Sequence, residues 1–481
     1  MLYSDGTFKT VTSDALNSRS ETSTFSDLEF NASLVTVLNV PSEYSTIALA
    51  LESAADGATI LVDDGSYSEN LVVDKSVTIE SVNGYQSTSV VSSTTGNVFL
   101  VNAPNVVIKG FDVYGATTYG RAGIYFNEGA HNGKALDNRC GYDNAHRNHS
   151  GIRIVKSDNV EIAGTICQVT GLYGIRAEFT NGSKIVNNVV EQQSFEGIYL
   201  VDSNNNEITG NTVSGNRTGV SLRKSNFNSV LNNVCSDNNE NGILVHQGDT
   251  NSITSNTCDN NDEVGIYFTE SNSNTLVSNQ ASLNGFSGIV FYKSDQAAIE
   301  QNVCNSNSSY GLYLNNSDLA TVQDNTCNLN SSRGLRLNFA NQNTITGNEF
   351  NFQRFGVEFN SSNDNVFVGN TVKSKITGIK GCEIQMRSSS NNVLFQNSFI
   401  SYTVEDVCSN NGSNNSWNSL TDVGYSYNGV QYSGVVGNYY SFANVVDGDN
   451  DGVSDTPVVL PGDEPEDVNA LISPIDDYVF E

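Results

Sequence analysis

The sequence predicts an all-β solenoid, in which coils of similar length stack into a rod. Two columns of recurring residues support this prediction. A glycine recurs in eleven steps, ten of 22 or 23 residues and one of 28, and an asparagine recurs with the same period. A fixed repeat in this range, made of strand-forming and turn-forming residues, is typical of stacked coils that bury their apolar faces against their neighbours.

The glycine column marks the start of a strand in each coil. Most of its members precede a short apolar stretch, such as Gly-Ile-Tyr-Leu at 197–200, whose residues favour strands. The members are Gly123, Gly151, Gly174, Gly197, Gly219, Gly242, Gly265, Gly288, Gly311, Gly334, Gly356 and Gly378.

The asparagine column predicts a ladder at a bend between strands. Asparagine tolerates the left-handed backbone region, and its amide can bond along a stack. The column comprises Asn138, Asn188, Asn211, Asn233, Asn256, Asn279, Asn302, Asn325, Asn348, Asn370 and Asn397, with Thr165 in one coil. Two residues after each member stands an apolar residue or a cysteine, so this third column is expected to point inward.

Short β-branched strands, glycine and asparagine bends and stacked coils are together the pattern of a right-handed parallel β-helix. The chain resembles the pectin-lyase-like β-helix superfamily and, within it, the NosD-like group found in many microbial cell-surface proteins. Segments 40–62 and 447–457 add to the resemblance, which covers about residues 36–460. It implies a fold of 22–23 residues per coil, and it implies little about activity because such scaffolds host unrelated functions.

Three regions are expected along the chain. Residues 1–34, rich in Ser and Thr, are predicted to be a flexible or docking arm, and 35–410 a β-helix. A short helix over 42–56, ended by Gly57, is expected to cap the first coil, whose open edge would otherwise pair with another chain. Residues 411–481 are predicted to form an acidic C-terminal cap.

The net charge of −30 argues against a nucleic-acid partner, which requires a basic surface. No run of 18 apolar residues is present, so no membrane span is expected. The first residues lack the basic and apolar blocks of a secretion signal. Other features nevertheless indicate an extracellular or cell-surface protein, and a leader is presumed to be absent from this numbering.

The cysteines indicate disulfide bonds between neighbouring coils. Residues in register on adjacent parallel strands lie about 4.8 Å apart, within the range a disulfide accepts. The alternative is a reduced ladder of small apolar thiols in the core. The candidate pairs are Cys140 with Cys167, Cys235 with Cys258, Cys304 with Cys327, and Cys382 with Cys408.

An aspartate-rich segment near the C-terminus predicts a Ca²⁺ site. Asp447, Asp449, Asp451, Val453 and Asp455 match positions 1, 3, 5, 7 and 9 of a calcium loop, with the carbonyl of Val453 as a ligand. Val458 replaces the usual glutamate at position 12, so another ligand must come from elsewhere. The alternative is a solvated acidic turn. Calcium here is expected to lock the cap and not to perform chemistry.

Ten Asn-x-Ser/Thr sequons are candidate glycosylation sites, although a chain rich in Asn and Ser yields several by chance. They are Asn31, Asn148, Asn181, Asn216, Asn307, Asn315, Asn330, Asn360, Asn411 and Asn414.

Two groups of residues are candidates for ligand chemistry. A loop in which the period stretches carries Tyr142, His146, Arg147 and His149, which could process a uronate sugar, although a decorated surface loop is the simpler interpretation. A stripe of outward residues after the glycines could bind a polysaccharide or a neighbouring subunit, or be ordinary strand surface. The stripe includes Arg153, Arg176, Glu178, Tyr199, Arg223, His246, Tyr267, Tyr292 and Arg336.

The favoured interpretation is a structural or adhesive component of a microbial cell envelope that self-associates or binds envelope partners. An extracellular enzyme that acts on acidic polysaccharide is the main alternative. A NosD-like role in metal delivery is a third, although methionine, a soft copper ligand, occurs only as Met1 and Met386.

Overall fold

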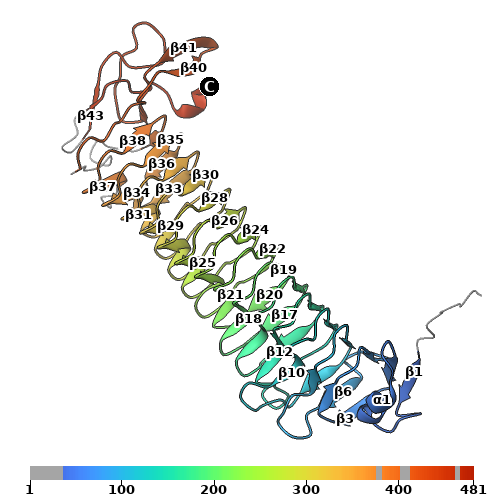
Figure 1. Cartoon of the computed structure of the whole chain (residues 1–481). Helices are drawn as coiled ribbons and strands as arrows, with labels where there is room; N and C mark the ends of the chain where they lie inside the picture. Colours follow the sequence, from blue (N-terminus) through green and yellow to red (C-terminus); the bar gives the residue numbers. More distant parts are fainter. Residues whose placement is uncertain (1–35, 375–381, 401–411, 461–465) are drawn as a thin grey trace, which may run out of the picture.

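The computed structural model describes residues 36–374, 382–400, 412–460 and 466–481. Short parallel strands stack into one elongated rod, as Figure 1 shows. They form a sheet of 16 strands (sheet 1), a sheet of 14 strands (sheet 2) and a third face made of shorter segments (sheet 3). The predicted all-β parallel β-helix is therefore confirmed.

Sheets 1 and 2 run along the rod with one strand from each coil. Sheet 1 contains β1 (Val37–Val40), β2 (Thr59–Val62), β5 (Thr78–Ser81), β8 (Val107–Lys109), β11 (Lys134–Leu136), β13 (Glu161–Ala163), β16 (Lys184–Val186), β19 (Glu207–Thr209), β22 (Ser229–Leu231), β24 (Ser252–Thr254), β26 (Thr275–Val277), β28 (Ala298–Glu300), β30 (Thr321–Gln323), β32 (Thr344–Thr346), β35 (Val366–Val368) and β38 (Val393–Phe395). Sheet 2 contains β4 (Leu71–Val73), β7 (Phe99–Val101), β10 (Ala122–Phe126), β12 (Ser150–Val155), β15 (Tyr173–Glu178), β18 (Glu196–Val201), β21 (Thr218–Arg223), β23 (Ile243–His246), β25 (Val264–Thr269), β27 (Ser287–Tyr292), β29 (Tyr310–Asn315), β31 (Arg333–Asn338), β34 (Phe355–Asn360) and β37 (Cys382–Arg387).

Sheet 3 is regular only in parts of the rod. Its strands are β3 (Gly65–Ser68), β6 (Thr88–Val91), β9 (Asp112–Tyr114), β14 (Ile166–Gln168), β17 (Val189–Glu191), β20 (Thr212–Ser214), β33 (Glu349–Gln353), β36 (Thr371–Ser374), β39 (Ser398–Ile400) and β42 (Tyr439–Tyr440). Between β20 and β33 each coil contributes a single bridging residue, as at Val234 and Thr257.

The register confirms the coil length and corrects one member of the glycine column. Successive inward residues of sheet 2, such as Ile175, Ile198 and Val220, pair directly across neighbouring coils. Near the end of the sheet Val357 pairs with Ile384, so the coil there is 27 residues long. Glu383, and not the predicted Gly378, therefore follows Gly356 in the column, and Gly378 lies outside the described residues.

The glycines are required by close packing against the inward column of sheet 3. A Cβ on Gly311 would lie 2.6 Å from Cβ of Cys327, and one on Gly265 would lie 2.8 Å from Cβ of Ala281. Real Cβ atoms essentially never approach so closely. Lack of space, and not a left-handed backbone, thus selects glycine at these positions.

Each regular coil turns at four corners, and each corner carries a ladder of buried polar side chains. In the predicted asparagine ladder, N and Nδ2 of Asn256 both donate to Oδ1 of Asn279, at 2.9 and 3.0 Å. Nδ2 of Asn256 also donates to the carbonyl of Val230 at 2.8 Å. The ladder therefore satisfies backbone groups that a bend would leave buried without partners.

Three further ladders were not predicted. One contains Asn148, Thr170, Gln193, Asn216, Asn238, Asn261, Asn284, Asn307, Asn330 and Gln353. Another contains Ser157, Thr180, Ser203, Ser225, Ser271, Ser294, Ser317, Ser362 and Ser389. The last contains Ser183, Asn206, Asn228, Asn251, Asn274, Asn343, Asn365, Asn392 and Asn415.

The left-handed backbone lies one residue before the ladder asparagine, and not on it. Asn187, Asn232 and Ser255 have φ of 54°, 54° and 53°, and each precedes a ladder member. The ladder position is thus selected for hydrogen bonding inside the rod, and the preceding position for the bend.

A buried aspartate ends the first ladder. Nδ2 of Asn397 donates to Oδ1 of Asn438, and N of Asn438 donates to Oδ2 of Asp467 at 2.8 Å. Burial raises the pKa of Asp467 to about 7, although hydrogen bonds from Asn438 and Asn469 act to lower it. The hydroxyl of Tyr440 also faces this carboxyl group.

We expect Asp467 to make the C-terminal end of the rod more stable in acid than at neutral pH. Its folded pKa is raised, so its stabilising contribution is fully present below the unfolded pKa of about 3.9 and is lost as pH rises to about 7. The loss is on the order of 4 kcal/mol. The measurement is hydrogen exchange at Asn438 and Tyr440 at pH 4.5 and 8 in wild type and Asp467→Asn. Equal pH dependence in the two proteins would contradict the expectation.

The N-terminal helix is shorter than predicted, because Thr46 caps it. Helix α1 (Ile47–Ser53) begins where the Thr46 side chain accepts from N of Leu49. The Glu69 carboxylate accepts from N of Ile47 at 3.0 Å, and Nζ of Lys75 donates to the carbonyl of Ala54 at 2.7 Å. Side chains of the following coils thus hold both ends of α1 at the N-terminal end of the rod (Figure 1).

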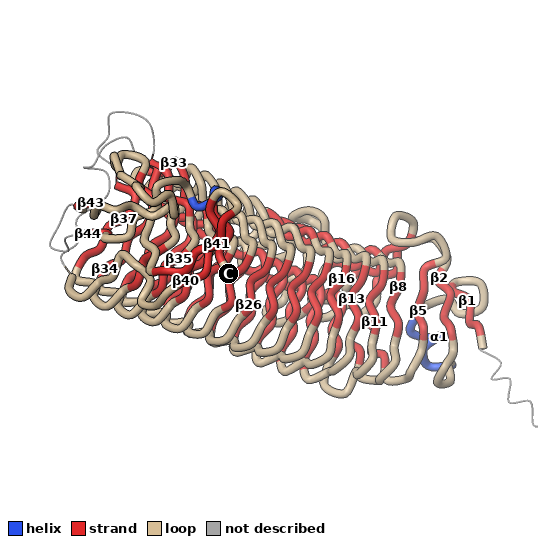
Figure 2. Tube along the Cα trace, turned by 90° about the horizontal axis from the view of Figure 1, so that it is seen from above, coloured by secondary structure: helices blue, strands red, loops and turns tan. Residues whose placement is uncertain are grey.

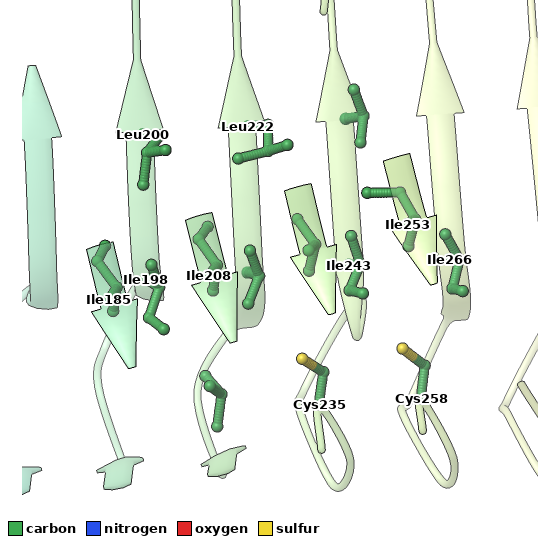
Figure 3. Packing of buried hydrophobic residues seen from close by; sticks show 14 of the residues in the cluster. Ile185, Ile198, Leu200, Ile208, Leu222, Cys235, Ile243, Ile253, Cys258 and Ile266 are labelled. Atoms are coloured by element: carbon green, nitrogen blue, oxygen red, sulfur yellow. The ribbon is translucent and has the colours of Figure 1, made fainter. Parts of the chain in front are cut away.

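One apolar core runs through the rod between the sheets. It is built from one inward residue in most strands of sheet 1, two in the strands of sheet 2, such as Ile198 and Leu200 in β18, and the inward column of sheet 3. Figure 2 shows the stack of coils from above, and Figure 3 shows Cys235 and Cys258 beside the isoleucine rows. Each coil is therefore buried by its two neighbours, as expected for a solenoid.

Candidate functional site

The aspartate loop gathers three carboxylates near the C-terminus. Ligand oxygens of Asp447, Asp449 and Asp451 lie within 4.8 Å of one another. Oδ2 of Asp447 accepts from N of Gly452 at 3.1 Å, and Oδ1 of Asp451 accepts from N of Val453 at 2.8 Å. This arrangement of hard oxygen ligands suits Ca²⁺. Calcium itself stays a prediction.

The other two predicted calcium ligands have different surroundings. Oδ2 of Asp455 accepts from N of Gly448 at 2.6 Å, so this carboxylate closes the loop on itself. Val453 is buried and bridges Leu471 in antiparallel fashion. The loop is thus attached to the body of the C-terminal region by its backbone at Val453.

Tyrosines beneath the loop fix its backbone. They come from an antiparallel sheet of β40 (Val423–Tyr427), β41 (Val430–Gly434) and β45 (Tyr478–Phe480). The short 3-10 helix η2 (Ile475–Asp477) comes directly before β45, and β43 (Val458–Val459) pairs with β44 (Glu466–Asp467) in a separate sheet. The Tyr432 hydroxyl donates to the carbonyl of Asn450 at 2.9 Å, and that of Tyr478 donates to the carbonyl of Gly452 at 2.5 Å. Gly452 has φ of 89° and packs on Tyr427, so a side chain there would collide.

The carboxylates of the aspartate loop raise the pKa values of groups beside them. Burial raises the pKa of Asp451, and the nearby carboxylates of Asp449, Asp447 and Asp455 raise it further. The pKa of Tyr425 is also raised, first by burial and then by Asp451. A bound cation would relieve this repulsion, which favours cation binding at the loop.

The predicted uronate site is divided between two groups. In the first, His146 stacks on Tyr142 with ring centroids 4.5 Å apart, and its Nδ1 lies 2.9 Å from Oδ1 of Asp143. The bond to His146 lowers the pKa of Asp143, so Asp143 is ionised and accepts from Nδ1–H. Nε2 of a neutral His146 is then the acceptor nitrogen.

His149 belongs to the second group, beside sheet 2. Its Nδ1 accepts from N of Gly120 at 3.3 Å, and its ring lies 4.9 Å from that of Tyr119. Burial lowers the pKa of His149, as do Arg176 and Arg153. A neutral His149 therefore carries its proton on Nε2 and is a hydrogen-bond donor. The fourth candidate, Arg147, is exposed in the loop between the groups.

The predicted binding stripe lies on one outer face of sheet 2, in two columns. Arg153, Arg176, Tyr199 and Tyr267 occupy one column, and Arg223, His246 and Tyr292 the column two residues later. Residues two apart on a strand share a face, so the geometry agrees with the prediction. Arg153 and Arg176 share the carboxylate of Glu178, at 2.8 and 3.0 Å. Ligand binding by this face stays a prediction.

Six cysteines have described side chains, and all six are buried free thiols in the core of this structure. Each predicted pair is adjacent: Cys140 and Cys167, like Cys304 and Cys327, lie within hydrogen-bond reach, and this contact raises the pKa of Cys140 and of Cys304. The structure contains no disulfide among the described residues, so the predicted bonds stay a prediction. In the fourth pair, Cys408 lies outside the described residues, so this pair stays a prediction.

Burial divides the predicted glycosylation sites. Four sequon asparagines are fully buried ladder members: Asn148, Asn216, Asn307 and Asn330. A glycan on any of them would break a ladder, so we expect these four asparagines to be unmodified in the folded protein. Asn181 and Asn414 are exposed, and Asn315 and Asn360 are half-buried. Asn31 and Asn411 lie outside the described residues.

We expect native protein to carry no glycan on the four ladder asparagines. Nδ2 of Asn216, for example, donates to the carbonyl of Val190 at 3.1 Å and to Oδ1 of Asn238 at 3.2 Å, and a glycosylated nitrogen, which keeps a single hydrogen, could not make both bonds. Glycopeptide mass spectrometry of protein from its source measures site occupancy. Glycan on Asn216 would contradict the structure, whereas glycan on Asn181 would agree with it.

Sequence reasoning placed Arg336 in the binding stripe but missed the rest of its polar cluster on the outer face of sheet 2. Arg333 and Arg336 both contact the buried carboxylate of Glu358, their Nε atoms lying 2.8 and 2.9 Å from Oε2. These residues are 22 to 25 positions apart in sequence, and the coil period was the available signal. Aligning the coils would have placed Glu358 directly beside Arg336.

The fold and the sequence place the protein in a known class. The class defined by the fold is the parallel β-helix. The family described as periplasmic copper-binding protein (NosD) matches residues 137–284 and 277–444, which is more than half of the chain. The protein belongs to this family. No described helix is long and apolar enough to cross a membrane.

Individual relatives are more distant. A cell surface glycoprotein of Methanothermus fervidus is 38% identical over 90 residues, which are 18% of this chain and 14% of the relative, so the match spans about one seventh of that protein. The mannuronan C-5 epimerase AlgE6 A-module of Azotobacter vinelandii is 15% identical, covering 62% of this chain and 92% of that one with a TM-score of 0.50. DFA-IIIase from Arthrobacter chlorophenolicus A6 is 15% identical, and the match covers 60% of this chain and 94% of that one with a TM-score of 0.48. The epimerase shows the fold alone. The glycoprotein and the periplasmic family agree with an extracellular or surface location.

The described residues do not fit a copper site. Copper favours thioether, thiolate and imidazole ligands. Met386 and the six described cysteines are buried in the core, and His146 and His149 belong to separate groups. Among the described residues, the aspartate loop is the group of three ligands close enough to hold a metal, and its oxygens suit a hard cation.

Proposed function

We propose that the protein is a structural and adhesive component of a microbial cell envelope. The observation that carries this proposal is the continuous outer face of sheet 2, where arginine, tyrosine and histidine side chains stand in register over many coils. A rod that presents one extended face suits contact with a long polymer or with a neighbouring molecule. The surface glycoprotein relative supports an envelope location.

Calcium has a structural role in this proposal. Asp447, Asp449 and Asp451 hold the ion, and the tyrosines below the loop transmit its effect to the antiparallel sheet at the end of the rod. Calcium therefore stabilises the C-terminal end and leaves the coils themselves unchanged.

Electron microscopy of the purified protein tests the proposal. Samples in millimolar calcium and in excess chelator, each with and without reductant, are compared. Ordered sheets, tubes or fibres that depend on calcium or on oxidised cysteines are the expected result. Isolated rods under every condition would contradict self-assembly.

A second candidate function is processing of an acidic polysaccharide at His146. The observation that favours it is the pair of Asp143 and His146, which leaves Nε2 free to accept a proton. His149 suits ligand binding better, because its Nδ1 is already engaged. Uronic-acid polysaccharides are screened for cleavage or epimerisation with wild type, His146→Gln and His149→Gln. Loss of activity in His146→Gln alone would establish this function, and an inactive wild type would exclude it for those substrates.

A further inference from the structure

Three guanidinium groups converge on one carboxylate near the C-terminal end of sheet 2. We name Arg333, Arg336, Glu358 and Arg387 the Glu358 cluster. Nη1 of Arg387 lies 3.7 Å from Oε1 of Glu358, and the other two arginines contact Oε2. The side chain of Glu358 is 1% exposed, whereas that of Arg387 is 51% exposed. One carboxylate balances one of three positive charges, so an anion can still bind on the solvent side.

The three arginines differ in how much binding capacity they keep. The Nε atoms of Arg333 and Arg336 are buried against Oε2 of Glu358. Nη1 of Arg336 donates to the hydroxyl of Tyr310 at 2.7 Å. Arg387 is the most loosely held of the three, since its contact is the longest. Guanidinium groups bind carboxylates through two parallel N–H groups, and Arg387 is exposed enough to offer both.

Aromatic rings and amides surround the cluster. The guanidinium of Arg336 lies 5.4 Å from the ring centroids of both Tyr310 and Tyr313. A row of half-buried asparagines leads along the rod to Arg387: Nδ2 of Asn338 donates to Oδ1 of Asn315, and Nδ2 of Asn360 donates to Oδ1 of Asn338. Asn360 pairs with Arg387 on the next strand. The row repeats at the coil spacing of about 4.8 Å.

We propose that the Glu358 cluster binds a carboxylate-bearing polysaccharide. A sugar carboxylate pairs with Arg387 and Arg336, and the amides of Asn338 and Asn360 contact sugar hydroxyls. A flat surface that repeats along the rod suits a polymer with its own repeat. The net charge of −30 repels an acidic polymer elsewhere and directs it to basic surface of this kind. This inference deepens the adhesive role proposed above by naming its ligand class.

Calorimetry with an oligogalacturonate of six sugars tests the site. The variant is Arg387→Gln, and the matched control is Lys134→Gln on sheet 1, whose side chain is 46% exposed and paired with Glu161. Both variants remove one exposed positive charge. We expect Arg387→Gln to weaken binding about tenfold and Lys134→Gln less than twofold. Binding of the wild type should weaken between 20 and 200 mM salt, and a neutral dextran oligomer should not bind.

Several outcomes would overturn the proposal. They are no binding of the acidic oligomer by wild type, equal losses in both variants, or equal binding of the neutral oligomer. Arg387→Lys keeps the charge without the planar fork, and we expect an intermediate loss, which also covers the case in which Arg387→Gln fails to fold. Calcium-dependent assembly seen by microscopy does not depend on these results, so failure of the site and failure of the envelope role remain distinguishable.

Discussion

Replacing Asn279 with aspartate is expected to destabilise the middle of the rod by about 3–5 kcal/mol. Asn279 is fully buried, and its Nδ2 donates to the carbonyl of Ile253 at 2.7 Å and to Oδ1 of Asn302 at 3.0 Å. Aspartate keeps the acceptor that Asn256 needs and removes both donors. It also places a carboxylate among buried oxygen atoms.

Asn272→Asp is the matched control for this substitution. Asn272 is exposed, and its Oδ1 accepts from N of Asp295 at 2.8 Å. Aspartates at the equivalent positions 249 and 295 make the same contact, so we expect a change below about 0.5 kcal/mol. Since solenoids open in segments, the measurement is local hydrogen exchange over β26 and β28. Equal effects of the two substitutions would show that the ladder contributes little stability.

Removal of calcium is expected to loosen the C-terminal end of the rod selectively. A ligand present at 100 times its dissociation constant stabilises the folded state by about 2.7 kcal/mol, and extracellular calcium modules bind with constants of about 10⁻⁴–10⁻³ M. The loop and the antiparallel sheet share the tyrosine contacts, so both should respond. Hydrogen exchange of β40, β45 and residues 447–455 is compared in calcium and in chelator.

Asp451→Asn should abolish the calcium response, because the substitution removes a charge at the centre of the loop. Asp476→Asn is the control, since Asp476 is exposed in η2. Protection of sheet 1 should be unchanged in both variants. A response that magnesium reproduces at equal concentration would indicate a general ionic effect and contradict a specific calcium site.

The period was enough to predict the fold, because the inward apolar residues and the bend residues recur at the same positions in successive coils. The reason for the glycines was not visible, since the clash of a Gly311 side chain with Cys327 involves two sheets. One ladder of four was predicted. Two of the others are also mainly asparagine and one is mainly serine, so their members resemble the ordinary turn residues of a chain rich in Asn and Ser.

The sequons show why a local motif was insufficient. Asn307 is a ladder member, and the turn that follows it begins with two serines. An asparagine followed by turn serines forms a sequon whether or not the asparagine is accessible. The loop that carries His146 and His149 was equally ambiguous. His146 packs on Tyr142, whereas His149, three residues later, packs on Tyr119. The local sequence does not separate these two groups, because contacts with other coils decide where each side chain lies.

The direction of the asparagine ladder has a consequence for the size of the molecule. Within the ladder each amide donates to the side chain of the next member toward the C-terminus, and Asp467, when ionised, accepts without donating. The ladder therefore ends at Asp467, because an ionised carboxylate has no hydrogen to donate to a further coil. Coils inserted or deleted upstream would change the reach of the rod in increments of about 4.8 Å while leaving both ends intact. The length of the rod is thus set by the number of coils between its two ends.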